Sequence, residues 1–346
     1  MGNKYPKLKV AAVQTAPVFL DREGTVEKAC HLIQEAGANC ADLIVFPECF
    51  IPAFPYWYRF YPASHPNCLH FNRELFKNAV EIPSECTERI CQAAKKANTY
   101  VVMGLNERRP RLLGTLYNTQ LFIHREGYIL GKHQKLMPSF FERMVHGLGD
   151  GSTLCVFPTE YGSVGGLCCG ENGNPLFRFV LMCQGEVVHA ANWPCYANPF
   201  DDGTTYELML LRARNYALEA KVFVVSAADI FTQETADTLK LDAEIREKIQ
   251  DWGGHSAIIG PRGQYLAGPA ESEETIIYAE INLEEIIEAR MWQDFTGHYN
   301  RFDIVSLNYN PSTIAPLKYT SSQAINEESV LPPILEEGEA EISESS

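Results

Sequence analysis

The sequence predicts an α/β fold whose sheets are buried beneath helices. Short β-branched runs alternate with longer segments of helical periodicity over most of the 346 residues, and this alternation is typical of sheets covered by helical layers. Two runs, 43–46 and 222–225, are apolar at every position, so both faces of those strands must be covered. No low-complexity linker divides the chain before about residue 320, so we expect one large domain over residues 1–320.

The position of each element follows from its hydrophobic period. The strands are expected, in order, at residues 8–15, 42–46, 100–105, 116–124, 164–168, 187–191, 222–227, 256–259 and 275–281. The helices are expected between them, at residues 23–38, 85–97, 175–184, 204–220 and 283–290. Pro83-Ser84 and Pro175 are start signals for two of these helices, because proline fits the first turn, where its missing N–H is not needed.

The last stretch of the chain has a different composition. From residue 321 onward it is rich in Glu, Ser and Pro, and such a segment cannot bury enough apolar surface to order itself. From Glu327 to the end it carries seven acidic residues and no Lys or Arg. We therefore expect a flexible acidic tail over residues 321–346. Docking of the apolar run 330–335 on a neighbouring subunit is the alternative.

The charge and the cysteine content exclude several classes of protein. Lys and Arg number 29 against 44 Asp and Glu, a formal net charge of −15, whereas nucleic-acid binding needs a clustered basic face. The 11 cysteines form no CxxC pair and no regular disulfide spacing, which favours a reducing, cytoplasmic compartment. The N-terminus lacks a signal-peptide pattern, and no run approaches the roughly 20 apolar residues of a membrane span. We expect partners among small molecules, with no nucleic acid and no membrane.

The first candidate catalytic residue is Glu48. It directly follows the apolar run Leu43-Ile44-Val45-Phe46-Pro47, and active sites of α/β folds assemble where strands end. At the edge of the core, desolvation would raise the pKa of this carboxyl toward that of a useful general base. The alternative is a glutamate that points into solvent.

Two further segments place reactive groups after predicted strands. Lys135, within Lys132-His133-Gln134-Lys135-Leu136-Met137-Pro138, could supply fixed positive charge to a developing anion, or it could be a surface lysine. Cys169 stands at a predicted strand-to-helix turn, where backbone N–H groups and a helix end favour the thiolate, and a core position is the alternative. Strand alternation puts Cys168 on the opposite face from Cys169, so Cys168 is interpreted as a core residue.

The segments Phe46-Pro47-Glu48, Lys135-Leu136-Met137-Pro138 and Gly165-Gly166-Leu167-Cys168-Cys169-Gly170-Glu171, in this order, resemble the nitrilase superfamily of carbon–nitrogen hydrolases. Further similar segments lie along almost the whole chain: Val10-Ala11-Ala12-Val13-Gln14, Phe54-Pro55-Tyr56-Trp57, 147–151, Gln184-Gly185-Glu186, Trp193-Pro194, Gly268-Pro269 and 297–301. The Phe-Pro-Tyr-Trp segment and residues 297–301 resemble the nitrilase branch in particular.

This resemblance implies a carbon–nitrogen hydrolase domain over residues 1–320 with a four-layer α-β-β-α sandwich. It also implies pairing of two subunits into an extended αββα-αββα dimer, and in this branch further assembly into spirals or filaments. By the same resemblance Cys169 matches the nucleophile, Glu48 the general base and Lys135 the group that stabilises the tetrahedral intermediate. Glu142 matches a second glutamate that orients the site in relatives.

Three more residues, Tyr56, Asn172 and Trp193, fall at positions that resemble those lining the substrate pocket, so we expect them to bind substrate.

One departure from the family pattern stands beside the nucleophile. Relatives usually carry Trp between the nucleophile and the following Glu, whereas this chain has Gly170. Loss of the indole is expected to enlarge or loosen the pocket, and it leaves the choice between nitrile and amide open.

The expected activity is hydrolysis of an organic nitrile to a carboxylic acid and ammonia through a thioimidate and a thioester on Cys169. The alternatives are an amidase with the same triad, an acyl transferase in which an amine replaces the second water, and a catalytically retired filament or binding protein. No cofactor or metal is expected, because His and Cys lack zinc-ligand spacing and no glycine-rich nucleotide loop is present. The sequence does not distinguish aliphatic, aromatic, arylacetic or β-cyanoalanine substrates, or cyanide.

Overall fold

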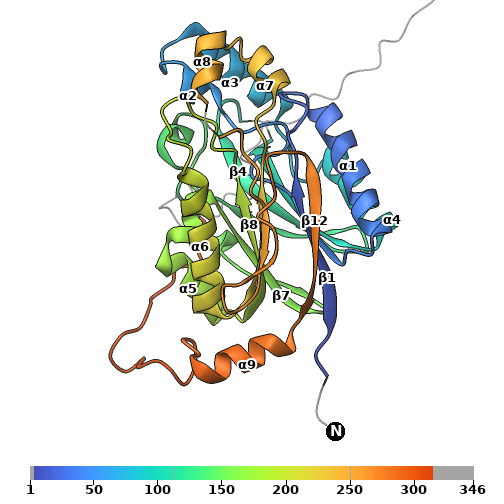
Figure 1. Ribbon diagram of the computed structural model, residues 1–346, viewed down its shortest axis with the longest axis vertical. Coiled ribbons are helices and arrows are strands. Elements are labelled where there is room, and N and C mark those ends of the chain that lie inside the picture. The colour runs from blue at the N-terminus through green and yellow to red at the C-terminus, as the bar shows by residue number, and fades with distance from the viewer. Residues whose placement is uncertain (1–3, 111, 250, 315–346) are drawn as a thin grey trace, which may run out of the picture. The chain divides into compact units, whose positions relative to one another are not determined.

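The computed structural model describes residues 4–110, 112–249 and 251–314 (Figure 1). Its contacts divide the chain into two units, Met1–Ser312 and Thr313–Ser346. Every helix and strand described below belongs to the first unit. The predicted tail over residues 321–346 lies outside the described residues, so its flexibility stays a prediction.

The strands of the described residues form two six-stranded sheets of the same design. The first has the order β12-β1-β2-β3-β4-β5, with β1 (Lys7–Gln14), β2 (Leu43–Val45), β3 (Tyr100–Arg108), β4 (Leu116–Ile123), β5 (Ile129–Gln134) and β12 (Thr275–Asn282). The second has the order β11-β10-β9-β8-β7-β6, with β6 (Phe157–Thr159), β7 (Gly162–Cys168), β8 (Glu186–Trp193), β9 (Phe223–Ala228), β10 (Ala257–Ile259) and β11 (Tyr265–Ala267). In both sheets the three central strands are parallel and the outer pairs are antiparallel.

Helices cover the outer faces of the two sheets, which gives a four-layer α-β-β-α sandwich. Helices α1 (Arg22–Ala38) and α4 (Glu85–Ala97) lie on the first sheet, and α5 (Pro175–Cys183) and α6 (Thr205–Ala220) lie on the second (Figure 1). The run 43–46 is buried on both faces as predicted. Ile44 packs in the cluster beneath α1 and α4, while its neighbour Val45 packs in the cluster between the sheets. The predicted fold is confirmed.

The remaining helices extend this core. They are α2 (Trp57–Phe60), α3 (Pro66–Asn78), α7 (Gln233–Thr238), α8 (Ala243–Lys248) and α9 (Glu284–Trp292), with the 3₁₀ turns η1 (Phe140–Met144), η2 (Gly151–Thr153) and η3 (Cys169–Gly173). Helices α2, α3, α7 and α8 gather at one end of the sandwich (Figure 1), where their apolar residues share one core cluster. The sequence analysis expected none of these four helices, because each is short or buries only a narrow apolar stripe.

One missed strand matters for the site. Strand β5 contains the polar run Lys132-His133-Gln134, which breaks the apolar alternation that predicts a strand. It is the edge strand of the first sheet, and only His133 and Gln134 are buried in it. An edge strand tolerates such polarity because one of its sides needs no partner. Lys135 follows its last residue, so this strand places the lysine.

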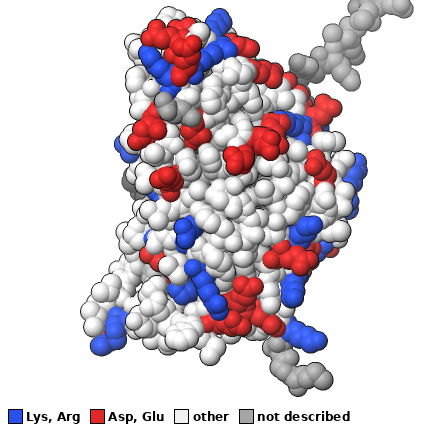
Figure 2. All heavy atoms as spheres, viewed as in Figure 1, with Lys and Arg blue, Asp and Glu red and all other residues white. Residues whose placement is uncertain are grey.

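Charged side chains of both signs are interspersed on the face seen in Figure 2, without a continuous basic area on that face. None of the helices in the described residues is long and apolar enough to cross a membrane. The described residues also include no group of three or more His, Cys, Asp and Glu arranged to hold a metal ion.

Candidate active site

Glu48 lies where the two sheets meet. Its backbone N–H donates to the carbonyl of Trp193 at 3.3 Å, and the side-chain amide of Asn192 donates to the carbonyl of Phe46 at 2.8 Å. These bonds join the segment after β2 in the first sheet to the end of β8 in the second. The side chain of Glu48 is fully buried, so the alternative of a solvent-exposed glutamate is wrong.

Lys135 is held between two carboxylates. Its Nζ donates to Glu48 Oε1 at 2.7 Å and to Glu142 Oε2 at 2.7 Å. The lysine is 1% exposed, so the surface alternative is wrong here too. Asn118 of β4 donates from Nδ2 to both glutamates, at 2.6 Å to Glu48 and 3.0 Å to Glu142. Three charged groups and one amide therefore form a single buried network.

The two glutamates of this network differ in their surroundings. Burial raises the pKa of Glu48 to about 7, with Lys135 opposing that rise and Glu142 adding to it. Burial would also raise the pKa of Glu142, but the charge of Lys135 holds it well below its usual range. Glu142 accepts a further bond from the backbone N–H of Ser139 at 2.9 Å, whereas Oε2 of Glu48 is buried with no hydrogen-bond partner among the described residues. Glu48 is thus the carboxylate equipped to accept a proton.

Cys169 starts the turn η3 directly after β7. Its φ angle is +48°, a left-handed conformation that costs a non-glycine residue roughly 1–3 kcal/mol. Asn172 supports this turn, because its Nδ2 donates to the carbonyls of Leu167 at 3.0 Å and Cys169 at 3.1 Å. Its Oδ1 faces His189 Nε2 at 2.8 Å. The sequence predicted that Asn172 binds substrate. In the structure both the NH₂ group and the oxygen of its amide contact other groups of the protein.

Cys169 is 9% exposed, and the charges of the lysine network act on its thiol. Burial raises its pKa to about 11, Glu48 raises it further, and Lys135 acts in the opposite direction. The thiol is therefore neutral in the resting site and needs a base to become a nucleophile. Cys168 is 1% exposed, which confirms that it is a core residue.

The sequence analysis missed a side chain that contacts the candidate nucleophile Cys169. The hydroxyl of Tyr196 lies 3.4 Å from Cys169 Sγ. A tyrosine three residues after Trp193, in an otherwise irregular loop, carries no sequence signal of its own. Asn118 was missed as well, although a signal existed: it begins the polar run Asn118-Thr119-Gln120 inside the buried strand β4.

The other two predicted pocket residues are fully enclosed. Trp193 is 0% exposed and shares a core cluster with Cys169, and its indole nitrogen is buried with no hydrogen-bond partner. Tyr56 is 1% exposed. Its hydroxyl donates to Asp229 at 2.5 Å and accepts from the backbone N–H of Cys195 at 2.8 Å. The Tyr56 hydroxyl is therefore fixed in an internal network.

Gly170 leaves space beside the nucleophile. A Cβ built on it would meet one neighbouring atom, the Oγ of Ser139 at 3.1 Å. A side chain here would point toward the segment that carries Glu142.

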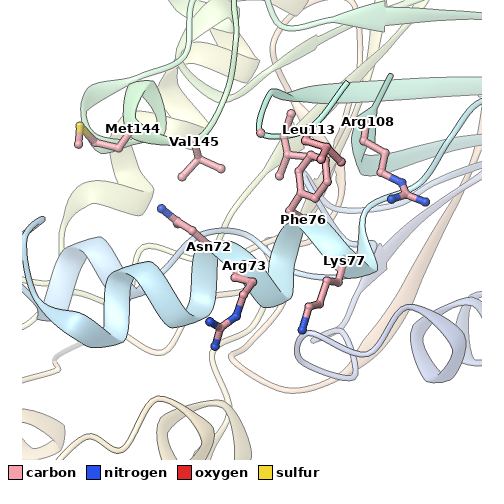
Figure 3. Close-up of a pocket in the computed structure, with 10 residues that line it drawn as sticks. Asn72, Arg73, Phe76, Lys77, Arg108, Leu113, Met144 and Val145 are labelled. Atoms are coloured by element: carbon pink, nitrogen blue, oxygen red, sulfur yellow. The ribbon is translucent and has the colours of Figure 1, made fainter. Parts of the chain in front are cut away.

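A separate cavity of about 640 Å³ lies between α3, the β3–β4 loop and the end of η1. Asn72 and Phe76 of α3 face Val145 and Leu113 across it (Figure 3). None of Glu48, Lys135, Glu142 and Cys169 is among the described residues that line it, so this cavity is separate from the candidate catalytic residues.

Comparisons with known proteins show which family the chain resembles. A family model described as carbon–nitrogen hydrolase matches residues 9–291. The chain is 36% identical over 323 residues to a nitrilase of Bacillus sp. (strain OxB-1), covering 93% of this chain and 94% of the relative. It is 36% identical over 312 residues to an aliphatic nitrilase of Rhodococcus rhodochrous, covering 89% of this chain and 84% of the relative.

Solved structures share the fold. A nitrilase-superfamily protein of Saccharomyces cerevisiae superposes with a TM-score of 0.65 at 24% identity, covering 84% of this chain and 95% of its own. A carbon–nitrogen hydrolase from Helicobacter pylori G27 superposes with a TM-score of 0.68 at 19% identity, covering 86% of this chain and 96% of its own.

The lysine network generates a stability prediction. We expect Lys135→Met to lower the free energy of unfolding by about 3–5 kcal/mol, because it leaves buried carboxylates without their cation. Lys248→Met is a matched control, since Lys248 also contacts a glutamate at 2.7 Å but in an exposed pair, and such pairs contribute about 0–1 kcal/mol. Urea unfolding at neutral pH measures both variants. Equal losses of unfolding free energy in the two variants would contradict the conclusion that Lys135 neutralises buried carboxylates.

Proposed function

The chain belongs to the carbon–nitrogen hydrolase family, and from that premise we propose that it is a nitrilase, which hydrolyses an organic nitrile to a carboxylic acid and ammonia. The observation that carries the proposal is the buried Lys135 between Glu48 and Glu142, whose charge lowers the pKa of the Cys169 thiol against the effect of burial. The relatives reported above, named nitrilases, support nitrile chemistry on this network.

The first half of the proposed reaction forms a covalent thioimidate. Glu48 accepts the proton of the Cys169 thiol while sulfur attacks the nitrile carbon. One bond of the carbon–nitrogen triple bond breaks, and its electron pair moves to nitrogen, where the charge of Lys135 stabilises it. The proton held by Glu48 then passes to this nitrogen. Glu142 keeps Lys135 in place.

The second half consumes two water molecules. Glu48 removes a proton from the first water as its oxygen adds to the thioimidate carbon, and the electron pair of the carbon–nitrogen double bond moves to nitrogen, which takes that proton from Glu48. The hydroxyl proton of the tetrahedral intermediate then passes through Glu48 to nitrogen, the carbon–nitrogen bond breaks, and ammonia leaves a thioester. Glu48 takes a proton from the second water as its oxygen attacks the thioester carbon, the carbon–sulfur bond breaks, and Glu48 returns this proton to the sulfur of Cys169. The sum is one nitrile and two waters giving one carboxylic acid and one ammonia.

The other candidate functions are less well supported. An amidase would use the same groups, but the relatives reported above are named nitrilases. A retired protein would not need to bury a lysine between two carboxylates, because burying those charges is costly. No observation favours acyl transfer.

Several further properties belong to the proposal. The substrate pocket is formed or braced by three buried residues: Trp193, Tyr56 and Asn172. The subunit self-associates into the extended dimer and from there into spirals or filaments, and exposed leucines on α5 and α6 support a helical interface: Leu176, Leu208, Leu211 and Leu218.

A cytoplasmic location is supported by the free thiols of all 11 cysteines, and residues 321–346 form the acidic tail.

The activity is tested by ammonia release from a panel of aliphatic, aromatic and arylacetic nitriles, each with its amide. We expect the intact chain to convert at least one nitrile to acid and ammonia, and Cys169→Ala to convert none, because the covalent intermediate cannot form. Cys40→Ala is the control, since Cys40 is an exposed free thiol. Hydrolysis of amides alone would replace the proposal with amidase chemistry.

We expect kcat/KM for nitrile hydrolysis to increase as the pH rises toward about 7. Glu48 accepts a proton only when ionised, and its pKa is raised to about 7, so kcat/KM for a neutral nitrile should fall about tenfold per pH unit below that value. The thiol, with its pKa raised to about 11, adds no step between pH 5 and 9. An acidic limb centred near the ordinary carboxyl pKa of about 4.3 would contradict the role of Glu48.

The space at Gly170 generates a specificity prediction. Gly170→Trp should lower kcat/KM for an arylacetonitrile relative to a small aliphatic nitrile by about tenfold or more, because the indole occupies room beside the nucleophile. Gly170→Ala, which adds one methyl group, should change this ratio little. Steady-state kinetics on both nitriles measure it, and an unchanged ratio in Gly170→Trp would show that the space is not part of the pocket.

A further inference from the structure

One buried carboxylate outside the lysine network joins the two segments that carry the candidate catalytic groups. Glu171, in η3, is 3% exposed. Its Oε2 accepts from the backbone N–H of Cys168 at 3.0 Å, and its Oε1 accepts from the backbone N–H of Leu136 at 2.6 Å. Cys168 directly precedes the nucleophile, and Leu136 directly follows Lys135.

A third contact fixes the direction of this carboxylate. Nε2 of His133 lies 3.1 Å from Glu171 Oε2, and Nδ1 of the same ring lies 3.1 Å from the carbonyl of Thr153. His133 is 1% exposed and belongs to β5, the strand that ends directly before Lys135. The imidazole thus ties Glu171 to the first sheet, while η3 ties it to the second.

The nucleophile turn needs such support. Cys169 is held at a φ of +48°, and a strained conformation of this kind persists only where its surroundings fix it. Asn172 holds the carbonyl side of Cys169, and Glu171 holds the N–H of the residue before it. Without the second contact the turn is free to relax, and the sulfur would move relative to Lys135.

We propose that Glu171 is a positioning residue, which sets the separation of the Cys169 thiol from the Lys135 ammonium by binding the backbone beside each of them. This role deepens the proposed function and rests on it for its kinetic consequence. It requires a carboxylate of this length, because the two backbone donors bind different oxygens. A glutamine turns an NH₂ group toward one of those donors, and an aspartate is one methylene too short.

The test compares Glu171→Gln with Glu107→Gln. Glu107 is equally buried, at 3%, but its bonds go to side chains of the first sheet: Thr119, Lys132 and Gln134. We expect Glu171→Gln to lower kcat for a nitrile about 100-fold with little change in KM, because a misplacement of about 1 Å costs about that much. Glu107→Gln should lose stability to a similar extent yet keep kcat within about threefold.

A second readout does not depend on the substrate. The rate at which iodoacetamide modifies Cys169, followed by mass spectrometry of its peptide, should fall in Glu171→Gln and not in Glu107→Gln, because Lys135 then lowers the pKa of the thiol less. Glu171→Asp keeps the charge but is one methylene too short to reach both backbone donors, so it should also lower kcat. Equal kcat losses in the two glutamine variants, or an unchanged rate of Cys169 modification in Glu171→Gln, would overturn the positioning role. Failure of the intact chain on every nitrile would reject the proposed function while the modification rates still decide the role of Glu171.

Discussion

Lys135 is a cation with 1% exposure, and a protein tolerates such a charge only where counter-charges and hydrogen bonds replace the lost water. Two carboxylates supply them, each at 2.7 Å, so the network holds one negative charge more than Lys135 can neutralise. The excess negative charge affects the ionisation of the two glutamates differently. Asn118 donates to both, but Glu142 also accepts from the backbone of Ser139 and stays ionised. Oε2 of Glu48 has no hydrogen-bond partner among the described residues, and burial raises its pKa to about 7. Pairs of groups whose pKa values are pushed apart mark acid–base assignments.

The sandwich architecture decides where this network stands. Between the sheets the packing is apolar in the centre, around residues such as Val45 and Val225. Toward the carboxyl ends of the central strands it becomes polar, and side-chain amides cross from one sheet to the other. Gln120 of β4 donates to the carbonyl of Ala190 at 3.0 Å and to Asn192 at 2.5 Å. These bonds fix the register of one sheet on the other, so groups from both sheets meet at the site.

The apolar runs in the sequence predicted buried strands and placed Glu48 and Cys169 at strand ends. The four layers and the expected roles of Glu48, Lys135 and Cys169 were implied by the resemblance to the nitrilase superfamily. The misses also share a cause. Strand β5 is polar and helix α3 has only a narrow apolar stripe, and both are stabilised by contacts with residues distant in the sequence. The local spacing of apolar residues does not reveal such contacts. Tyr196 reaches Cys169 from a loop 27 positions further along the chain, and loop geometry of that kind is set by packing, which the spacing of residues does not encode.

The surplus negative charge also constrains how the thiol can be used. In cysteine enzymes that pair the thiol with an imidazolium, positive charge favours a preformed thiolate. Here Glu48 and Glu142 oppose that state, burial raises the pKa of Cys169 to about 11, and Lys135 offsets the rise only in part. Because the thiol pKa lies above that of Glu48, the proton stays on sulfur until the carbon–sulfur bond begins to form. Attack therefore needs an electrophile that takes up the negative charge within reach of Lys135. In the proposed reaction a nitrile does so, because its nitrogen becomes anionic as sulfur adds and can then receive the proton that Glu48 would have taken.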